Sequence, residues 1–161
     1  RGSCRRRRGW VPDHYVTGIL TAMRHPLHPA FVHFPVVCWS FAVAADLVGL
    51  WLGETAWTWS SGLLAADCAM AVLAVMAGMF ELSHVPEGAP MRDAWVHMVA
   101  MLAAFTLFTA RLILRLDHLQ PLAPDMMSLM LDAGGFIGLA VGGWFGGRLV
   151  YGHGVGRDQP E

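Results

Sequence analysis

Four long apolar stretches dominate the pattern of hydrophobic and polar positions along the chain. They are Pro29–Leu52, Ala56–Phe80, Ala94–Leu114 and Met126–Gly147. Crossing the hydrocarbon core of a bilayer takes about 20 residues in a helix, so each stretch is long enough to span a membrane. None of them alternates polar and apolar residues with a period of two, as the strands of a membrane barrel do. The pattern predicts an all-α fold of four membrane-spanning helices.

The segments that connect these stretches are short and rich in residues that end helices. Gly53–Thr55 follows the first stretch, Val85–Pro90 lies between the second and third, and Pro121–Asp125 precedes the fourth. Short connections join antiparallel neighbours in helical bundles. We therefore expect an up-down-up-down four-helix bundle with both ends of the chain on the same side.

The composition agrees with a protein embedded in a lipid bilayer. The 161 residues are 55% hydrophobic and 14% charged, whereas soluble domains have roughly 45–50% apolar and about 25% charged residues. Disordered chains are poor in apolar residues, so the same figures exclude that class for the chain as a whole.

The distribution of arginines predicts the orientation in the membrane. The formal net charge is −1, and all eleven basic residues are arginines. In a four-span bundle nine of them fall on the side of the two termini, and Arg111 and Arg115 fall toward the other side. Basic residues favour the cytoplasmic side. We expect both termini in the cytoplasm and the protein in the bacterial inner membrane.

Residues 1–22 are expected to be a disordered leader or basic arm, followed by a four-helix transmembrane domain over residues 23–157 and a tail over residues 158–161. The arm contains Arg5–Arg8 but lacks the apolar core of a secretory signal. It is either a segment upstream of a start at Met23 or an arm that binds anionic lipid. Nucleic acid is not an expected partner, because no polar recognition domain follows the basic run.

Helical projection predicts which face of each helix points into the bundle. Membrane helices pack through small residues, so a stripe of small and polar side chains marks the predicted interior. The predicted stripes are His33, Val37, Ser40 and Ala44; Asp67, Ala71, Ala74, Gly78 and Glu81; His97, Met101, Ala104, Phe108 and Arg111; and Asp132, Gly135, Leu139, Gly142 and Gly146.

Four charged residues form a predicted intramembrane charge cluster: Asp46, Asp67, Arg111 and Asp132. Charges at this depth are costly and usually face a partner or water. The simpler interpretation is an ion pair of Arg111 with Asp132 or Asp46 that fixes helix register. The alternative is a path for protons.

Two histidines are candidate ligands of a cofactor. His33 and His97 are expected at a similar depth, about 6–8 Å inside the cytoplasmic ends of their helices. The first and third helices of a cyclic bundle are diagonal partners, so the two rings are expected to face each other as axial ligands of a b-type haem. The alternatives are structural hydrogen bonding and a metal or proton site. His28 is followed by Pro29 and is interpreted as part of the helix start.

The residues from His25 to Pro35 and from Gly146 to Gly156 resemble the small bacterial membrane proteins of the domain of unknown function 2231 family. Acidic residues at Asp46 and Glu81 and an early histidine at His97 are similar to the same pattern, in which Asp is usual at the position of Glu81. The resemblance covers roughly residues 23–157. It implies the four-helix fold and the membrane location, and it implies no activity.

Two classes of function therefore remain open. The first is a haem-binding redox protein that exchanges electrons with quinone or with a redox membrane complex. The second is a non-catalytic accessory or assembly protein, without a cofactor, whose His and Gly motifs are structural; either one can form a homo-oligomer. No nucleophile, base and acid converge at one depth, so a hydrolase is disfavoured.

Overall fold

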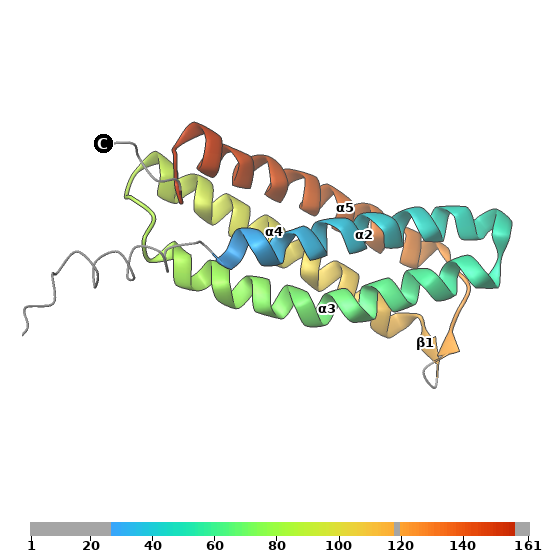
Figure 1. Ribbon diagram of the computed structural model, residues 1–161. Helices are drawn as coiled ribbons and strands as arrows, with labels where there is room; N and C mark the ends of the chain where they lie inside the picture. Colours follow the sequence, from blue (N-terminus) through green and yellow to red (C-terminus); the bar gives the residue numbers. More distant parts are fainter. Residues whose placement is uncertain (1–26, 118–119, 157–161) are drawn as a thin grey trace, which may run out of the picture.

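The computed structural model describes residues 27–117 and 120–156, which form four long helices that run side by side (Figure 1). The segment 1–22, expected to be disordered, and the tail 158–161 lie outside the described residues. The helices are α2 (Leu27–Leu52), α3 (Glu54–Leu82), α4 (Ala89–Leu114) and α5 (Met126–Gly147). A turn of π-helix, η1 (Arg148–Gly152), extends α5, and the short strands β1 (Leu116–Asp117) and β2 (Gln120–Pro121) pair antiparallel after α4.

The helices begin and end at residues suited to sharp turns. Gly53 and Gly88 precede α3 and α4 with φ of 70° and 96°, in the left-handed region that favours glycine. Asp125 caps α5, because its Oδ1 accepts a hydrogen bond of 2.8 Å from the backbone N–H of Ser128. The same bond holds the pKa of Asp125 below its usual range.

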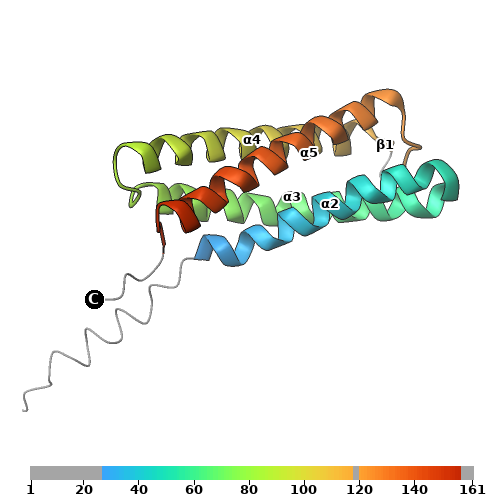
Figure 2. The same cartoon turned by 90° about the horizontal axis from the view of Figure 1, so that it is seen from above.

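The bundle consists of two tight hairpins. α2 packs mainly on α3 and α4 packs mainly on α5, with fewer contacts between the two hairpins. Figure 2 shows α4 and α5 on one side of the bundle and α2 and α3 on the other. We call the boundary between the hairpins the seam. α2 and α4 are diagonal across it, as the cyclic arrangement predicts.

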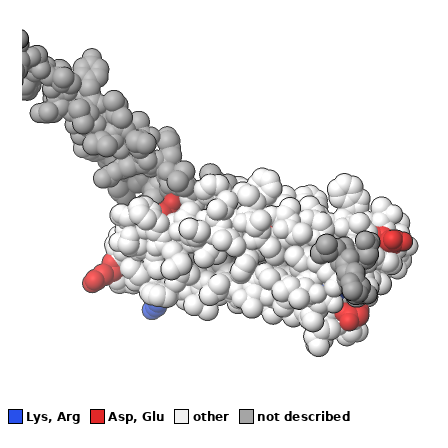
Figure 3. All heavy atoms as spheres, turned by 90° about the horizontal axis from the view of Figure 1, so that it is seen from below, with Lys and Arg blue, Asp and Glu red and all other residues white. Residues whose placement is uncertain are grey.

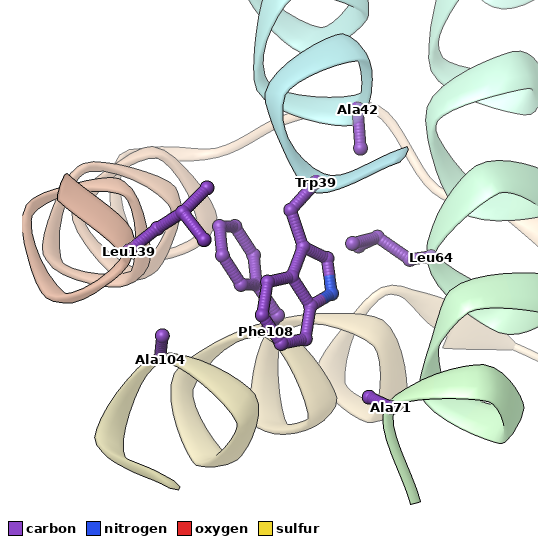
Figure 4. Close-up of a cluster of buried hydrophobic side chains, with 7 residues drawn as sticks. All are labelled: Trp39, Ala42, Leu64, Ala71, Ala104, Phe108 and Leu139. Atoms are coloured by element: carbon purple, nitrogen blue, oxygen red, sulfur yellow. The ribbon is translucent and has the colours of Figure 1, made fainter. Parts of the chain in front are cut away.

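An aromatic stack fills the centre of the bundle. Trp39 of α2 and Phe108 of α4 lie with their ring centroids 5.0 Å apart and their planes 22° from parallel. Small and branched side chains from all four helices surround this stack, as Figure 4 shows: Ala42, Leu64, Ala71, Ala104 and Leu139. The core therefore links both hairpins through α2 and α4.

The surface of the bundle is apolar along its length. Figure 3 shows one face on which charged residues gather at the two ends with uncharged surface between them. Phe41, Met76 and Ile137 are among many large apolar side chains that are exposed. All four helices are long and apolar enough to cross a membrane. An all-α bundle of four candidate spans is the fold that the sequence predicted.

The predicted interior face of the first helix is wrong. His33, Val37 and Ala44 are exposed, whereas Trp39 and Asp46 on another face of α2 are buried. Small residues lie on both faces of α2, since Ala42 is buried and Ala44 is exposed, and the interior face is marked instead by the large indole of Trp39. The stripes predicted on the other three helices are buried or half-buried.

The orientation of the bundle in the membrane is testable with single cysteines. Glu54 and Glu87 are both exposed and lie in connections at opposite ends of the bundle. We expect an impermeant thiol reagent added to intact cells to label Glu54→Cys and to leave Glu87→Cys unlabelled until the cells are broken, because the excess of arginines predicts that the Glu87 side is cytoplasmic. Labelling of Glu87→Cys from outside would reverse the orientation.

Candidate functional site

Two histidines from different hairpins meet at one end of the bundle interior. His28 stands in the first turn of α2 and His97 in the third turn of α4. Their ring centroids are 6.1 Å apart and their planes are perpendicular. Nδ1 of His28 is 2.9 Å from the carbonyl oxygen of Ala74, and Nδ1 of His97 is 2.7 Å from that of Gly142. Each ring is thereby bound to the partner helix of its own hairpin.

Glycines give both rings the room to pack against these partner helices. A Cβ added at Gly78 of α3 would lie 2.9 Å from Cε1 of His28, and one added at Gly146 of α5 would lie 3.1 Å from Cε1 of His97. Such approaches are closer than ordinary contact, so a side chain at either position would displace the ring.

The two hairpins present these groups at corresponding positions. His28 and His97 are 69 residues apart, as are Trp39 and Phe108, which stack on each other. The residues that these side chains contact on α3 and α5 also match: Ala74 and Gly142 are 68 residues apart, as are Gly78 and Gly146. The site is therefore built from two equivalent halves, one from each hairpin.

The hydrogen bonds fix the tautomer that the two rings present. A carbonyl oxygen only accepts, so each Nδ1 must carry a hydrogen and donate it, which leaves Nε2 as the lone-pair nitrogen of the neutral ring. Glu81 contributes at the backbone of the same turn: its Oε1 accepts a bond of 3.1 Å from the N–H of His28. Two imidazoles with bonded Nδ1 and available Nε2 are a donor set for a metal centre.

His33 does not take part in this arrangement. The structure corrects its expected interior position, since its side chain is exposed on the bundle surface. His28, interpreted from the sequence as part of the helix start, supplies the ring that faces His97. The sequence contains a signal for His28: it lies 50 residues before Gly78, and His97 lies 49 residues before Gly146.

The segment after α5 closes over the same end of the bundle. Asp93 of α4 is buried, its Oδ2 accepts a hydrogen bond of 2.9 Å from Nε2 of His153, and the same oxygen forms an ion pair with Arg148 at 3.0 Å. Asp93 stands one helical turn before His97. These contacts hold η1 and the following turn against the start of α4.

A second polar layer, which we call the ion-pair layer, lies toward the other end of the bundle. Arg111 is fully buried, donates to Asp46 and to Ser60 Oγ at 2.6 Å, and has its Nε 3.4 Å from Asp132. Arg115 also donates to Asp46. Two arginines thus face two aspartates, so the formal charges in this layer cancel.

Asp67 belongs to neither layer. It is fully buried, and neither of its side-chain oxygens has a hydrogen-bond partner. The structure therefore brings together three members of the predicted charge cluster, Asp46, Arg111 and Asp132, and leaves the fourth apart.

His28 and His97, which we call the histidine layer, are the donor side chains that the described part of the chain brings together at this end. Within residues 27–117 and 120–156, no three His, Cys, Asp or Glu side chains are grouped so that they could hold a metal ion. Cys38 and Cys68 are free thiols, and Cys68 Sγ is 3.5 Å from Thr109 Oγ1.

These features define a polytopic membrane protein whose polar side chains are gathered inside a four-helix bundle. The family model described as "Predicted membrane protein (DUF2231)" matches residues 24–159, and the chain belongs to this family. A comparison with curated proteins and one with solved structures found no match.

The ion-pair layer is expected to dominate the stability of the bundle. Arg111→Met would remove the salt-bridge partner of the buried Asp132, and breaking a buried pair in this way costs about 3–5 kcal/mol. The free energy of unfolding in detergent measures this loss. Arg148→Met is the control, because the Arg148 side chain is 46% exposed and Asp93 keeps His153 as a hydrogen-bond partner, so its loss should be smaller. Equal losses in the two variants would contradict the assignment.

The glycine contact of His97 is open to a matched test. Gly146→Ala should lower the free energy of unfolding by about 1–3 kcal/mol, because the new methyl group overpacks against the ring. Gly143→Ala, three residues earlier, places its methyl group where no atom lies within 4 Å and should cause no loss. A Gly146→Ala variant as stable as Gly143→Ala would show that the ring moves freely.

Proposed function

We propose that the protein binds one b-type haem between its two hairpins, with His28 and His97 as axial ligands, and works as a membrane redox protein. The observation that carries this proposal is the convergence of two imidazoles, each with Nδ1 tied to a carbonyl oxygen. That bond sets the tautomer and orientation an axial histidine needs. The proposed location is the bacterial inner membrane, with this end of the bundle toward the cytoplasm, where Arg92 and Arg148 also lie.

The separation of the rings supports an iron atom between them. An imidazole nitrogen lies about 2.0–2.1 Å from a bound metal and about 1.1 Å from its own ring centre, so two rings that held one metal ion between them would have centroids about 6.2–6.4 Å apart. The observed value is 6.1 Å.

The small donor set also favours haem over a bare metal ion. A porphyrin supplies four nitrogens, so two protein ligands complete six-coordinate iron. Each ligand comes from a different hairpin, and the seam between them is the less densely contacted boundary of the bundle. A cofactor held there would join the two halves.

A haem held by His28 and His97 would supply one-electron transfer chemistry. The proposed partners are therefore a quinone in the bilayer or a redox membrane complex. The chain would hold the haem by His28 and His97 and shield it within the apolar bundle.

A second candidate function is favoured by the same two hydrogen bonds. Each histidine already joins the helices of its own hairpin, through Ala74 in one case and Gly142 in the other. In that case the two histidines only hold the helices together, and the protein is a non-catalytic accessory or assembly protein without a cofactor.

The absorbance of the purified protein distinguishes the two functions. We expect protein purified in detergent, or reconstituted with haemin, to show a Soret band and an α-band that sharpens on reduction, with one haem per chain by the pyridine haemochrome assay. His28→Ala and His97→Ala should each lose more than nine-tenths of this absorbance.

His33→Ala is the matched control, since it removes an exposed histidine five residues from His28 and should keep the full spectrum. Each variant is checked for helix content and elution volume. Wild-type protein that takes up no haem, or full absorbance in both His28→Ala and His97→Ala, would favour the structural candidate.

A further inference from the structure

Asp67 is a buried carboxyl group without a partner in the middle of the bundle. Its exposed fraction is 0%, and both Oδ atoms lack a hydrogen-bond partner. Among the residues that the structure describes, Asp46 and Asp132 each have an arginine, whereas no salt bridge is found for Asp67. A charged carboxylate left alone in an apolar interior costs far more than a neutral acid.

The indole of Trp39 supplies a second unpartnered polar group facing the same helix. Trp39 is 1% exposed, and its Nε1 has no hydrogen-bond partner. Figure 4 shows the indole nitrogen on the side of α3, toward Leu64 and Ala71. Asp67 stands three residues after Leu64 and four before Ala71, on the same buried face of α3.

This position lies between the two polar layers. Ser60, which binds Arg111, and Ala74, which binds His28, are each seven residues from Asp67 along α3. Seven residues of helix rise about 10.5 Å, so neither layer provides a direct partner at the level of Asp67.

We propose that Asp67 and Trp39 form a buried binding site for one proton and one water molecule at the midpoint of the bundle. The proton resides on the carboxyl group, which is thereby neutral. The water accepts a hydrogen bond from the indole N–H and bonds to the carboxyl group, and these contacts provide the two or more polar partners that a buried water needs. The site gives the bundle a neutral carboxyl group at membrane depth.

The titratable and charged groups around the site are few. Cys38 of α2 is within electrostatic reach of Asp67, and Cys68 follows it in α3 and contacts Thr109 of α4. Arg111 of α4 and Asp132 of α5 are engaged with each other in the ion-pair layer. The histidines of the other layer complete the set.

Infrared spectroscopy of the purified protein tests the site whether or not haem binds. We expect wild-type protein at pH 7 to show a C=O stretch of a neutral carboxylic acid that shifts when aspartate carries carbon-13 in its side-chain carboxyl. Asp67→Asn should lose this band completely, and Trp39→Phe should keep it at a higher frequency because the bridging water is lost.

Asp125→Asn is the control, since Asp125 caps α5 at the surface and Asn is also a good cap; it should leave the band unchanged. Absence of the band in wild type, or its persistence in Asp67→Asn, would overturn the proposal. An unchanged frequency in Trp39→Phe would overturn the shared water. Failure of Asp67→Asn to fold would also count against it, because Asn matches the neutral acid in shape and charge.

Discussion

The bundle depends on one constraint: a polar side chain inside a bilayer has to find its partner within the protein, because lipid offers none. Arg111 shows how strong this constraint is. It can be buried only if α2, α3 and α5 bring Asp46, Ser60 and Asp132 to the same level of α4. Once these contacts form, the rotation of each helix about its own axis is fixed. With the helices in this rotation, His28 and His97 face each other at the other end of the bundle.

The sequence was sufficient to predict the four spans and the interior faces of three of them. Glycines and charged residues on one face of α3, α4 and α5 mark that face as buried, and Arg111 needed an acid from another helix. The face of α2 was predicted wrongly because its small residues are not confined to one side. Ser40 is an example, since its hydroxyl donates to the carbonyl oxygen of Val36 in its own helix and so needs no partner from the bundle interior.

Of the two residues in the histidine layer, only His97 could be predicted from the sequence. His97 lies on a clear interior stripe, whereas His28 stands at the beginning of a helix, where a side chain can point to several neighbours. Its direction is decided by Gly78, 50 residues later in the sequence, which leaves space for the ring on α3. Contacts of this kind depend on the packing of two helices, and the pattern along either helix alone does not contain them. The separation of Asp67 from the Arg–Asp layer has the same origin.

The hydrogen bonds of the two histidines lie within hairpins, while the ion pairs of Arg111 and Arg115 with Asp46 cross the seam. This division has a consequence for the order in which the chain is made and inserted. The first hairpin can close around His28 and Ala74 as soon as both have left the ribosome, and the second hairpin can do so around His97 and Gly142. Asp46, however, is synthesised 65 residues before Arg111. During that interval the nascent first hairpin holds an acid whose counter-charge does not yet exist, so docking of the second hairpin is the step that commits the protein to its final form.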